Sequence, residues 1–420
     1  MKALVVIGLL AACGGGSASD GGIGGDGGGA DAATGGPHPF GTHGGYQDGA
    51  LFPSGAQADL DQATADFYDG WKARYLETAC AAGQMRVKTS PDTDAYTVSE
   101  GHGYGMLVTA IMAGHDPDAQ AEFDGLVRYY QAHPSSATPG LMAWAQDAGC
   151  NDVMGADSAT DGDLDIAYAL LLADRQWGSA GDIDYRAAAL DAIAAILAGD
   201  VHPADSILVG DWATTGDPHY TGTRSSDQMP SHFHAFAAAS GQDRWNDVAD
   251  RSYATIDYLQ IQSAPATGLL PDFVTGATGA TPQPAPADWL EGADDGHFSW
   301  NACRDPWRIA TSWLIDGDGG ALTATRRITA WAEASTGGDP AQLVDGYALD
   351  GTALGSNPEM AFVAPFMVAA MVPPAAGSGQ AWLDALWQEV AARAPGNYYG
   401  DSIKLLAMVV ASGNWWSPVF

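Results

Sequence analysis

Basic residues are scarce in this sequence, which holds 17 Lys and Arg against 51 Asp and Glu and carries a formal net charge of −34. A surface of that sign repels nucleic acid and anionic lipid, so we expect neither as a partner. Only four cysteines are present, without a CxxC pair or a Cys/His cluster that would suggest zinc. The sequence also lacks a P-loop and a His-rich ligand set, so we expect no metal and no cofactor.

Long apolar runs are missing near the N-terminus, where residues 3–10 are too few to span a bilayer. This run leads to Ala11, Ala12 and Cys13, which resemble the lipobox of bacterial lipoproteins, whose cysteine is acylated. An ordinary secretory signal with an incidental Cys13 is the alternative. We expect a signal over residues 1–13 and an exported chain, lipid-anchored to the cell envelope or secreted, that meets the membrane only through this anchor.

Residues 14–36 are almost all Gly, Ala, Ser and Asp, a composition that cannot bury a core and predicts a disordered tether. Three cysteines follow it: Cys80, Cys150 and Cys303. An oxidising compartment would permit one disulfide and leave one thiol, and the sequence leaves the pairing open.

Strand-like alternation of apolar and polar residues is rare, with residues 206–209 the one candidate. Helical spacing instead recurs about twelve times after residue 59, for example in Phe67, Trp71 and Tyr75. Residues 360–371 are apolar on all sides, which predicts a fully buried helix. Long loops rich in Gly, Pro and aromatic residues separate the helices. We therefore expect one all-α domain over residues 37–420, with loops that build a groove at one end.

One segment, Ser99-Glu100-Gly101-His102-Gly103-Tyr104-Gly105-Met106, places a carboxylate before three alternating glycines. Glycine permits positive φ and close approach of the backbone to a ligand, so Glu100 could be held stiffly over a groove. The alternative is an ordinary helix start with an acidic first turn.

A second segment, residues 158–167, contains three closely spaced acids, Asp161, Asp163 and Asp165. It lacks the Gly and Glu that an EF-hand loop needs at its sixth and twelfth positions. Helix capping by Thr160 or Asp161 accounts for part of the cluster but not for all three acids.

These segments resemble motifs of glycoside hydrolase family 8. Residues 161–177 resemble the family signature, residues 99–106 its proton-donor segment, residues 301–308 a third segment and residues 397–406 its C-terminal block; residues 224–233 resemble a mid-chain block. The likeness runs from about Phe67 to Trp416. It implies an (α/α)6 barrel and inverting hydrolysis of β-1,4-linked glycans, with cellulose-type glucan, lichenan, xylan and chitosan among the family's substrates.

The resemblance assigns Glu100 as the general acid. An inverting glycosidase also needs a carboxylate base about 6.5–9.5 Å from the acid. Some branches of the family carry an Asp base where this chain has Asn301, and an amide cannot accept the proton of water. In the branch with Asn there, a Glu of the preceding loop takes the role. We therefore predict Glu291 as the base, with Asp161 as the alternative and otherwise as a ligand of the sugar in the reacting subsite.

Glycan binding calls for aromatic residues, because sugar rings stack their C–H faces on them. Loop aromatics are the candidates: Trp144, Trp212, Tyr220, Trp300 and Tyr398. We also predict substrate contacts for Asp227, Asn301 and Arg304, the last holding Asp161 or the sugar. Asp227 could instead cap the helix that is expected to start near Pro230.

The expected partner is a β-linked polysaccharide bound by a monomer. We expect β-glucan of the cellulose or lichenan type, with chitosan or xylan as alternatives. Asn301 motivates a further alternative, a surface glycan-binding lipoprotein that has lost catalysis.

Overall fold

The computed structural model describes residues 38–90 and 94–419. The predictions for Cys13, for the signal over residues 1–13 and for the tether over residues 14–36 lie outside the described residues. None of the helices in the described part is long and apolar enough to pass through a bilayer.

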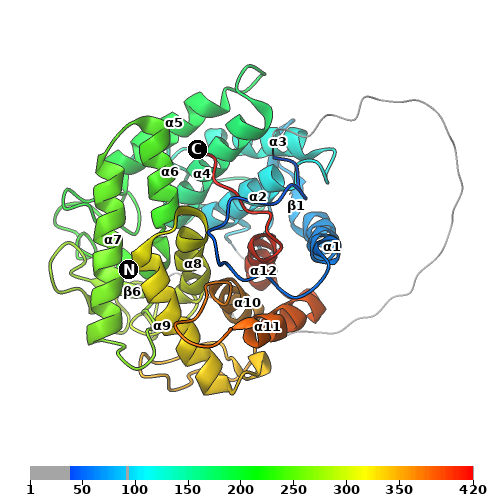
Figure 1. Cartoon of the computed structure of the whole chain (residues 1–420). Coiled ribbons are helices and arrows are strands. Elements are labelled where there is room, and N and C mark those ends of the chain that lie inside the picture. The colour runs from blue at the N-terminus through cyan, green and yellow to red at the C-terminus, as the bar shows by residue number, and fades with distance from the viewer. Residues whose placement is uncertain (1–37, 91–93, 420) are drawn as a thin grey trace, which may run out of the picture.

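Six helices form an inner ring and six more surround it (Figure 1). The inner helices are α2 (Ser99–Ile111), α4 (Thr160–Trp177), α6 (Pro230–Ser240), α8 (Asp305–Asp316), α10 (Met360–Ala369) and α12 (Tyr398–Ala411). Each contacts the next, and α12 contacts α2 and closes the ring. The outer helices are α1 (Gln57–Tyr75), α3 (Ala119–Ala132), α5 (Tyr185–Gly199), α7 (Arg244–Gln262), α9 (Gly319–Thr336) and α11 (Gln380–Ala392). The predicted (α/α)6 barrel is thereby confirmed.

Burial explains the two kinds of helix. Every residue of α10 is buried, because an inner helix has neighbours on all sides, as its uniformly apolar sequence predicts. The outer helix α1 buries one face instead, which includes Trp71 and Tyr75, while the residues between them face outward. The helical period of the sequence therefore reports correctly which elements are amphipathic.

Strands are short and lie in the connections. β1 (Leu76–Thr78) pairs with β2 (Met85–Val87), and β3 (Thr97–Val98) pairs with β4 (Ala145–Gln146). β6 (Phe273–Thr275) lies between β5 (Thr223–Arg224) and β7 (Gln283–Pro284). The predicted strand over residues 206–209 is wrong, since Ile207 makes only an isolated bridge to Val201. Short 3-10 turns occupy Ser225–Asp227 (η1), Ala302–Arg304 (η2) and Pro340–Gln342 (η3).

The sequence left the cysteine pairing open, and the structure joins Cys80 to Cys150. Cys303 is free and buried. The bridge ties the turn after β1 to the loop that follows β4. Because β4 pairs with β3, and β3 runs directly into α2, the disulfide supports the segment from which α2 begins.

Candidate active site

The glycines around Glu100 are helical. α2 begins at Ser99, so Glu100 lies in its first turn and the three glycines that follow are part of the helix. None of the three has positive φ, so the expectation of a glycine turn over a groove is wrong and the ordinary acidic helix start is right. The position still affects Glu100, because the partial positive charge of a helix N-terminus stabilises the ionised form of a carboxyl group.

Gly103 of α2 and Gly162 of α4 allow close packing between these two helices. A Cβ on Gly103 would lie 2.8 Å from Cβ of Asp165, and one on Gly162 would lie 2.5 Å from the carbonyl carbon and Oγ of Ser99. These distances leave no room for a methyl group. The absence of a side chain at Gly103 and Gly162 therefore allows the first turns of α2 and α4, which carry Glu100 and Asp161, to pack closely.

The three acids of α4 have three different partners. Asp161 turns toward the site, where its Oδ2 meets two arginines. Asp163 turns away and accepts from the backbone N–H of Met142 at 2.9 Å. Asp165 is buried against Arg308, with nitrogen-to-oxygen distances of 2.8 and 2.5 Å. The predicted side-chain cap at Thr160 or Asp161 is wrong, because α4 begins at Thr160 without one.

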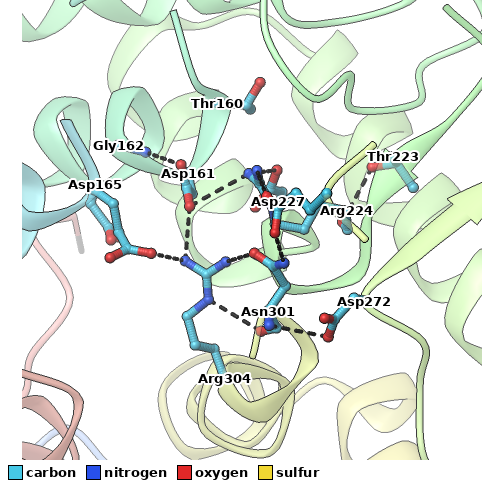
Figure 2. A network of polar contacts seen from close by, with 12 residues as sticks. Thr160, Asp161, Gly162, Asp165, Thr223, Arg224, Asp227, Asp272, Asn301 and Arg304 are labelled. Atoms are coloured by element: carbon cyan, nitrogen blue, oxygen red, sulfur yellow. Dashed lines mark hydrogen bonds and ion pairs between the residues drawn. The ribbon is translucent and has the colours of Figure 1, made fainter. Parts of the chain in front are cut away.

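Arg304, at the end of η2, joins the two acids at the helix starts. Its Nη1 donates to Oε2 of Glu100 and to Oδ2 of Asp161, both at 2.8 Å. Its Nη2 donates to Oδ1 of Asn301 at 3.1 Å. Figure 2 shows the guanidinium between Asp161 and Asn301. Arg304 is fully buried, so both ion pairs are poorly screened by solvent.

Glu291 completes the network from the long loop before η2. Nδ2 of Asn301 donates to its Oε2 at 2.8 Å, and Nη2 of Arg224 lies 3.5 Å from its Oε1. Nη1 of Arg224 lies 3.5 Å from Oδ2 of Asp161. Asn301 thus donates to Glu291 on one side of the site and accepts from Arg304 on the other, which a carboxylate at this position could not do because it only accepts.

Two buried aspartates shape the backbone on which Glu291 and Asn301 stand. Asp272 accepts from the backbone N–H groups of Ser299, Asn301 and Ala302 at 2.7–3.1 Å. Asp295 accepts from the N–H groups of residues 290, 291 and 292 at 2.7–3.2 Å. Both side chains therefore replace regular secondary structure in holding a loop.

The environment divides the carboxyl groups by proton affinity. Burial raises the pKa of Glu100 to about 7, against the pull of Arg304 and with the help of the charge on Asp161. Burial would also raise the pKa of Asp161, but Arg224 and Arg304 outweigh it and the pKa falls to about 2. Burial raises the pKa of Glu291 too, opposed by Arg224 and Asn301. Glu100 can thus hold a proton near neutral pH while Asp161 stays ionised.

Solvent reaches the three acids unequally. The Glu100 side chain is 18% exposed, against 7% for Asp161 and 9% for Glu291. Glu100 is therefore the carboxyl group that a ligand arriving from solvent meets most readily.

Two further predicted residues join the network. The hydroxyl of Tyr398, at the start of α12, donates to Oε1 of Glu100 at 3.3 Å. Asp227 of η1 is fully buried and accepts from Nη1 of Arg224 at 3.2 Å (Figure 2). It does not cap α6, whose N-cap is Met229 without a side-chain bond.

The other predicted aromatics are half-buried, and no contact ties their rings to the carboxylates. The carbonyl of Trp144 accepts from the N–H of Ser99, next to Glu100. Trp212 and Tyr220 pack on a small apolar cluster beneath the Glu291 loop. Trp300 packs on Phe362 at 5.1 Å between ring centroids. Sugar stacking on these residues stays a prediction, as does the groove.

One group in the described chain has the composition of a metal site: His234, Asp316 and Asp318. Nδ1 of His234 lies 3.7 and 3.6 Å from the two carboxylates, and Asp318 also accepts from the Tyr253 hydroxyl. The group lies where α8 ends and α9 begins, whereas Glu100 and Asp161 lie in the first turns of α2 and α4. A hollow of about 530 Å³ between residues 265–268 and α9 likewise contains none of the acids.

Sequence reasoning missed part of the network. Arg224 belongs to the family-like segment 224–233, but no role was predicted for it. In the structure it contacts Asp161, Asp227 and Glu291. The hydroxyl of Tyr104 accepts from Arg304 at 3.3 Å and has the spacing of a plain core residue. Basic residues are scarce in this chain, so an arginine that opens a family-like segment, as Arg224 does, was the available signal of a role in the site.

Comparison with known proteins places these residues in context. The family model described as "Glycosyl hydrolases family 8" matches residues 50–413. The chain is 47% identical over 381 residues to a beta-glucanase of Niallia circulans, a match that covers 90% of this chain and 91% of that protein. It is 38% identical to an endoglucanase of Bacillus sp. strain KSM-330, over 87% of this chain and 78% of that protein.

Solved structures agree with the sequence matches. The apo structure of a beta-1,3-1,4-glucanase from Paenibacillus sp. X4 has 46% identity and a TM-score of 0.87, and the match covers 90% of this chain and 99% of that chain. A cold-adapted family 8 xylanase has 19% identity and a TM-score of 0.70, over 90% of this chain and 97% of that chain. The second likeness is one of fold alone.

Proposed function

Because this chain belongs to glycosyl hydrolase family 8 and is a glycoside hydrolase, we propose that it is an endo-acting β-glucanase of the lichenan and cellulose type that cleaves β-1,4 bonds with inversion. The similarity to a beta-glucanase and to a beta-1,3-1,4-glucanase over about nine tenths of the chain supports mixed-linkage glucan as the substrate. The observation that carries the catalytic part is the split in proton affinity between Glu100 and its ionised neighbour Asp161.

In the proposed mechanism Glu100 is the acid. Its proton passes to the glycosidic oxygen as the bond from that oxygen to the anomeric carbon breaks. A water molecule attacks the anomeric carbon from the opposite face, and Glu291 takes one of its protons. The products are a reducing end of inverted configuration and a free hydroxyl on the leaving chain. Tyr398 and Arg304 hold the Glu100 carboxyl in place during the transfer.

Geometry favours Glu291 over Asp161 as the base. Asp161 and Glu100 bind the same nitrogen of Arg304, so their oxygens lie within two hydrogen-bond lengths of each other, and inverting acids and bases need a wider gap. A carboxylate with a pKa of about 2 is also a weak proton acceptor. Glu291 reaches Glu100 only through intervening side chains, either Asn301 and Arg304 or Arg224, Asp161 and Arg304, and this favours a wider gap between the two carboxyl groups. We assign Asp161 to the sugar hydroxyls of the reacting subsite.

The test combines natural and activated substrates. Purified protein should release reducing ends from lichenan faster than from xylan or chitosan, and proton NMR at early times should show the α-anomer. Glu100→Gln should lose most activity on lichenan but retain it on a 2,4-dinitrophenyl β-cellooligosaccharide, whose leaving group needs no proton. Glu291→Gln should lose activity on both. Absence of hydrolysis with every glycan would favour the glycan-binding alternative, and full activity of Glu291→Gln would remove only the base assignment.

We also propose that the chain is exported, anchored through Cys13 and monomeric. The Cys80–Cys150 disulfide supports export, since such bonds persist in oxidising compartments. Radiolabelled palmitate should enter the full chain expressed in a bacterium and be absent from Cys13→Ser. Light scattering on the protein without lipid should give the mass of one chain.

A further inference from the structure

A histidine outside the catalytic network contacts the backbone of the loop that carries Glu291. His219 lies in the connection between α5 and β5, and its Nε2 is 2.8 Å from the backbone carbonyl oxygen of Trp289. Its Nδ1 is 2.8 Å from Oδ1 of Asp217. The same Oδ1 accepts from the backbone N–H of His219 at 2.8 Å, which fixes Asp217 relative to the ring.

Both ring nitrogens of His219 are engaged, because each lies 2.8 Å from an oxygen that accepts hydrogen bonds. The ring therefore links Asp217 of its own loop to the backbone of the facing loop.

The residue that His219 holds is the anchor of the Glu291 loop. The Trp289 ring meets the His219 ring edge-on at 4.7 Å and the Phe273 ring at 5.6 Å between centroids. A Cβ on Gly222 would overlap the Trp289 ring. Two residues later comes Glu291, in a tight loop closed by Asp295. Movement of the Trp289 carbonyl would therefore move the Glu291 backbone.

We propose that Asp217 and His219 form a positioning pair that holds the loop carrying Glu291 through the Trp289 carbonyl. The proposal rests on the proposed role of Glu291 as the base. Asp217 contacts the ring from its own loop and the Trp289 carbonyl contacts it from the facing loop. The Trp212 ring packs edge-on against it.

Kinetics of the whole protein test this pair. We measure kcat and KM on a 2,4-dinitrophenyl β-cellooligosaccharide, whose hydrolysis does not depend on the Glu100 proton.

The variants separate positioning from general damage. His219→Gln should lower kcat at least about 10-fold, since a misplacement of 1 Å can cost about 10²-fold, and should leave KM within about twofold. Asp217→Asn should lower kcat in the same direction, because an amide oxygen accepts a weaker hydrogen bond than a carboxylate does. His202→Gln is the matched control: this histidine belongs to the same connection and its ring lies 4.5 Å from the Tyr220 ring between centroids, and its replacement should change neither quantity.

A His219→Gln enzyme with the kcat of the wild type would overturn the proposal, as would an equal loss in the His202→Gln control. If the histidine results hold but Glu291→Gln stays active, the loop is held as inferred and the base assignment alone fails. The two failures are therefore distinguishable.

Discussion

Replacing Gly162 by Ala tests whether the missing side chain between α2 and α4 sets the distance between Glu100 and Asp161. The new Cβ would lie 2.5 Å from the carbonyl carbon of Ser99, a backbone atom that cannot rotate away. Carbon atoms rest at about 3.5–4.0 Å from each other, so the first turn of α2 must move by roughly 1 Å. Glu100 is the next residue and moves with it.

Two opposed effects determine whether Gly162→Ala raises or lowers the free energy of unfolding. Alanine in a helix is favoured over glycine by about 0.5–1 kcal/mol. Overpacking of a rigid contact costs about 1–3 kcal/mol, so we expect a net loss of about 1–2 kcal/mol in the free energy of unfolding. The displacement should lower kcat/KM on lichenan by about 10²-fold.

Gly70→Ala in the outer helix α1 is the matched control. Its Cβ would meet nothing closer than Nη2 of Arg74 at 4.0 Å, so the helix term acts alone. This variant should gain about 0.5–1 kcal/mol in stability and keep its activity. Both quantities come from denaturant unfolding with the disulfide intact and from initial rates on lichenan.

A double variant shows that the contact is the cause. Ser99→Gly removes the Oγ and Cβ that crowd Gly162, so combined with Gly162→Ala it should restore part of both stability and rate, a coupling that distant sites do not show. A Gly162→Ala enzyme at least as stable as the wild type and within twofold of its kcat/KM would refute the packing argument.

Three further outcomes follow from the same site. The pH profile of kcat/KM on lichenan should be bell-shaped. The acid must be protonated, so activity falls as pH rises through the pKa of Glu100 at about 7. The base must be ionised, so activity falls as pH drops through the pKa of Glu291, which burial raises. Asn301→Asp should shift the low-pH limb upward, because a second carboxylate 2.8 Å from Glu291 raises its pKa further, and an unshifted limb in the rate measurements would argue against Glu291 as the base. Replacing Cys80 and Cys150 by serine should cost about 2–4 kcal/mol in unfolding experiments, and a loss of kcat that exceeds this instability would show that the bridge also supports the start of α2.

The sequence was a good guide to the elements and a poor one to their contacts. Helical spacing identified α10 as fully buried and α1 as one-sided, because burial on a helix depends on local periodicity. Family motifs pointed to Glu100, Asp161 and Arg304, and the structure joins all three in one network. Their catalytic and binding roles remain predictions.

What could not be predicted depends on how closely two distant helices approach. Only the crossing of α2 and α4 reveals that Gly103 and Gly162 serve packing rather than a ligand. The same crossing decides that Asp161 faces the site while Asp163 turns to a backbone N–H, although all three acids of α4 look alike in sequence. His219 was invisible for this reason too, since Trp289 lies 70 residues away along the chain.

Arg304 donates hydrogen bonds of equal length to Glu100 and Asp161, yet the pKa of Glu100 is raised to about 7 and that of Asp161 is lowered to about 2. The difference comes from what else each one meets. Asp161 has Arg224 beside it as well, and two cations outweigh its burial. For Glu100 the effect of burial exceeds that of Arg304, and the negative charge on Asp161 adds to it. Even without accepting a proton from water, an ionised Asp161 would therefore serve catalysis, because it helps Glu100 keep the proton that the leaving oxygen needs.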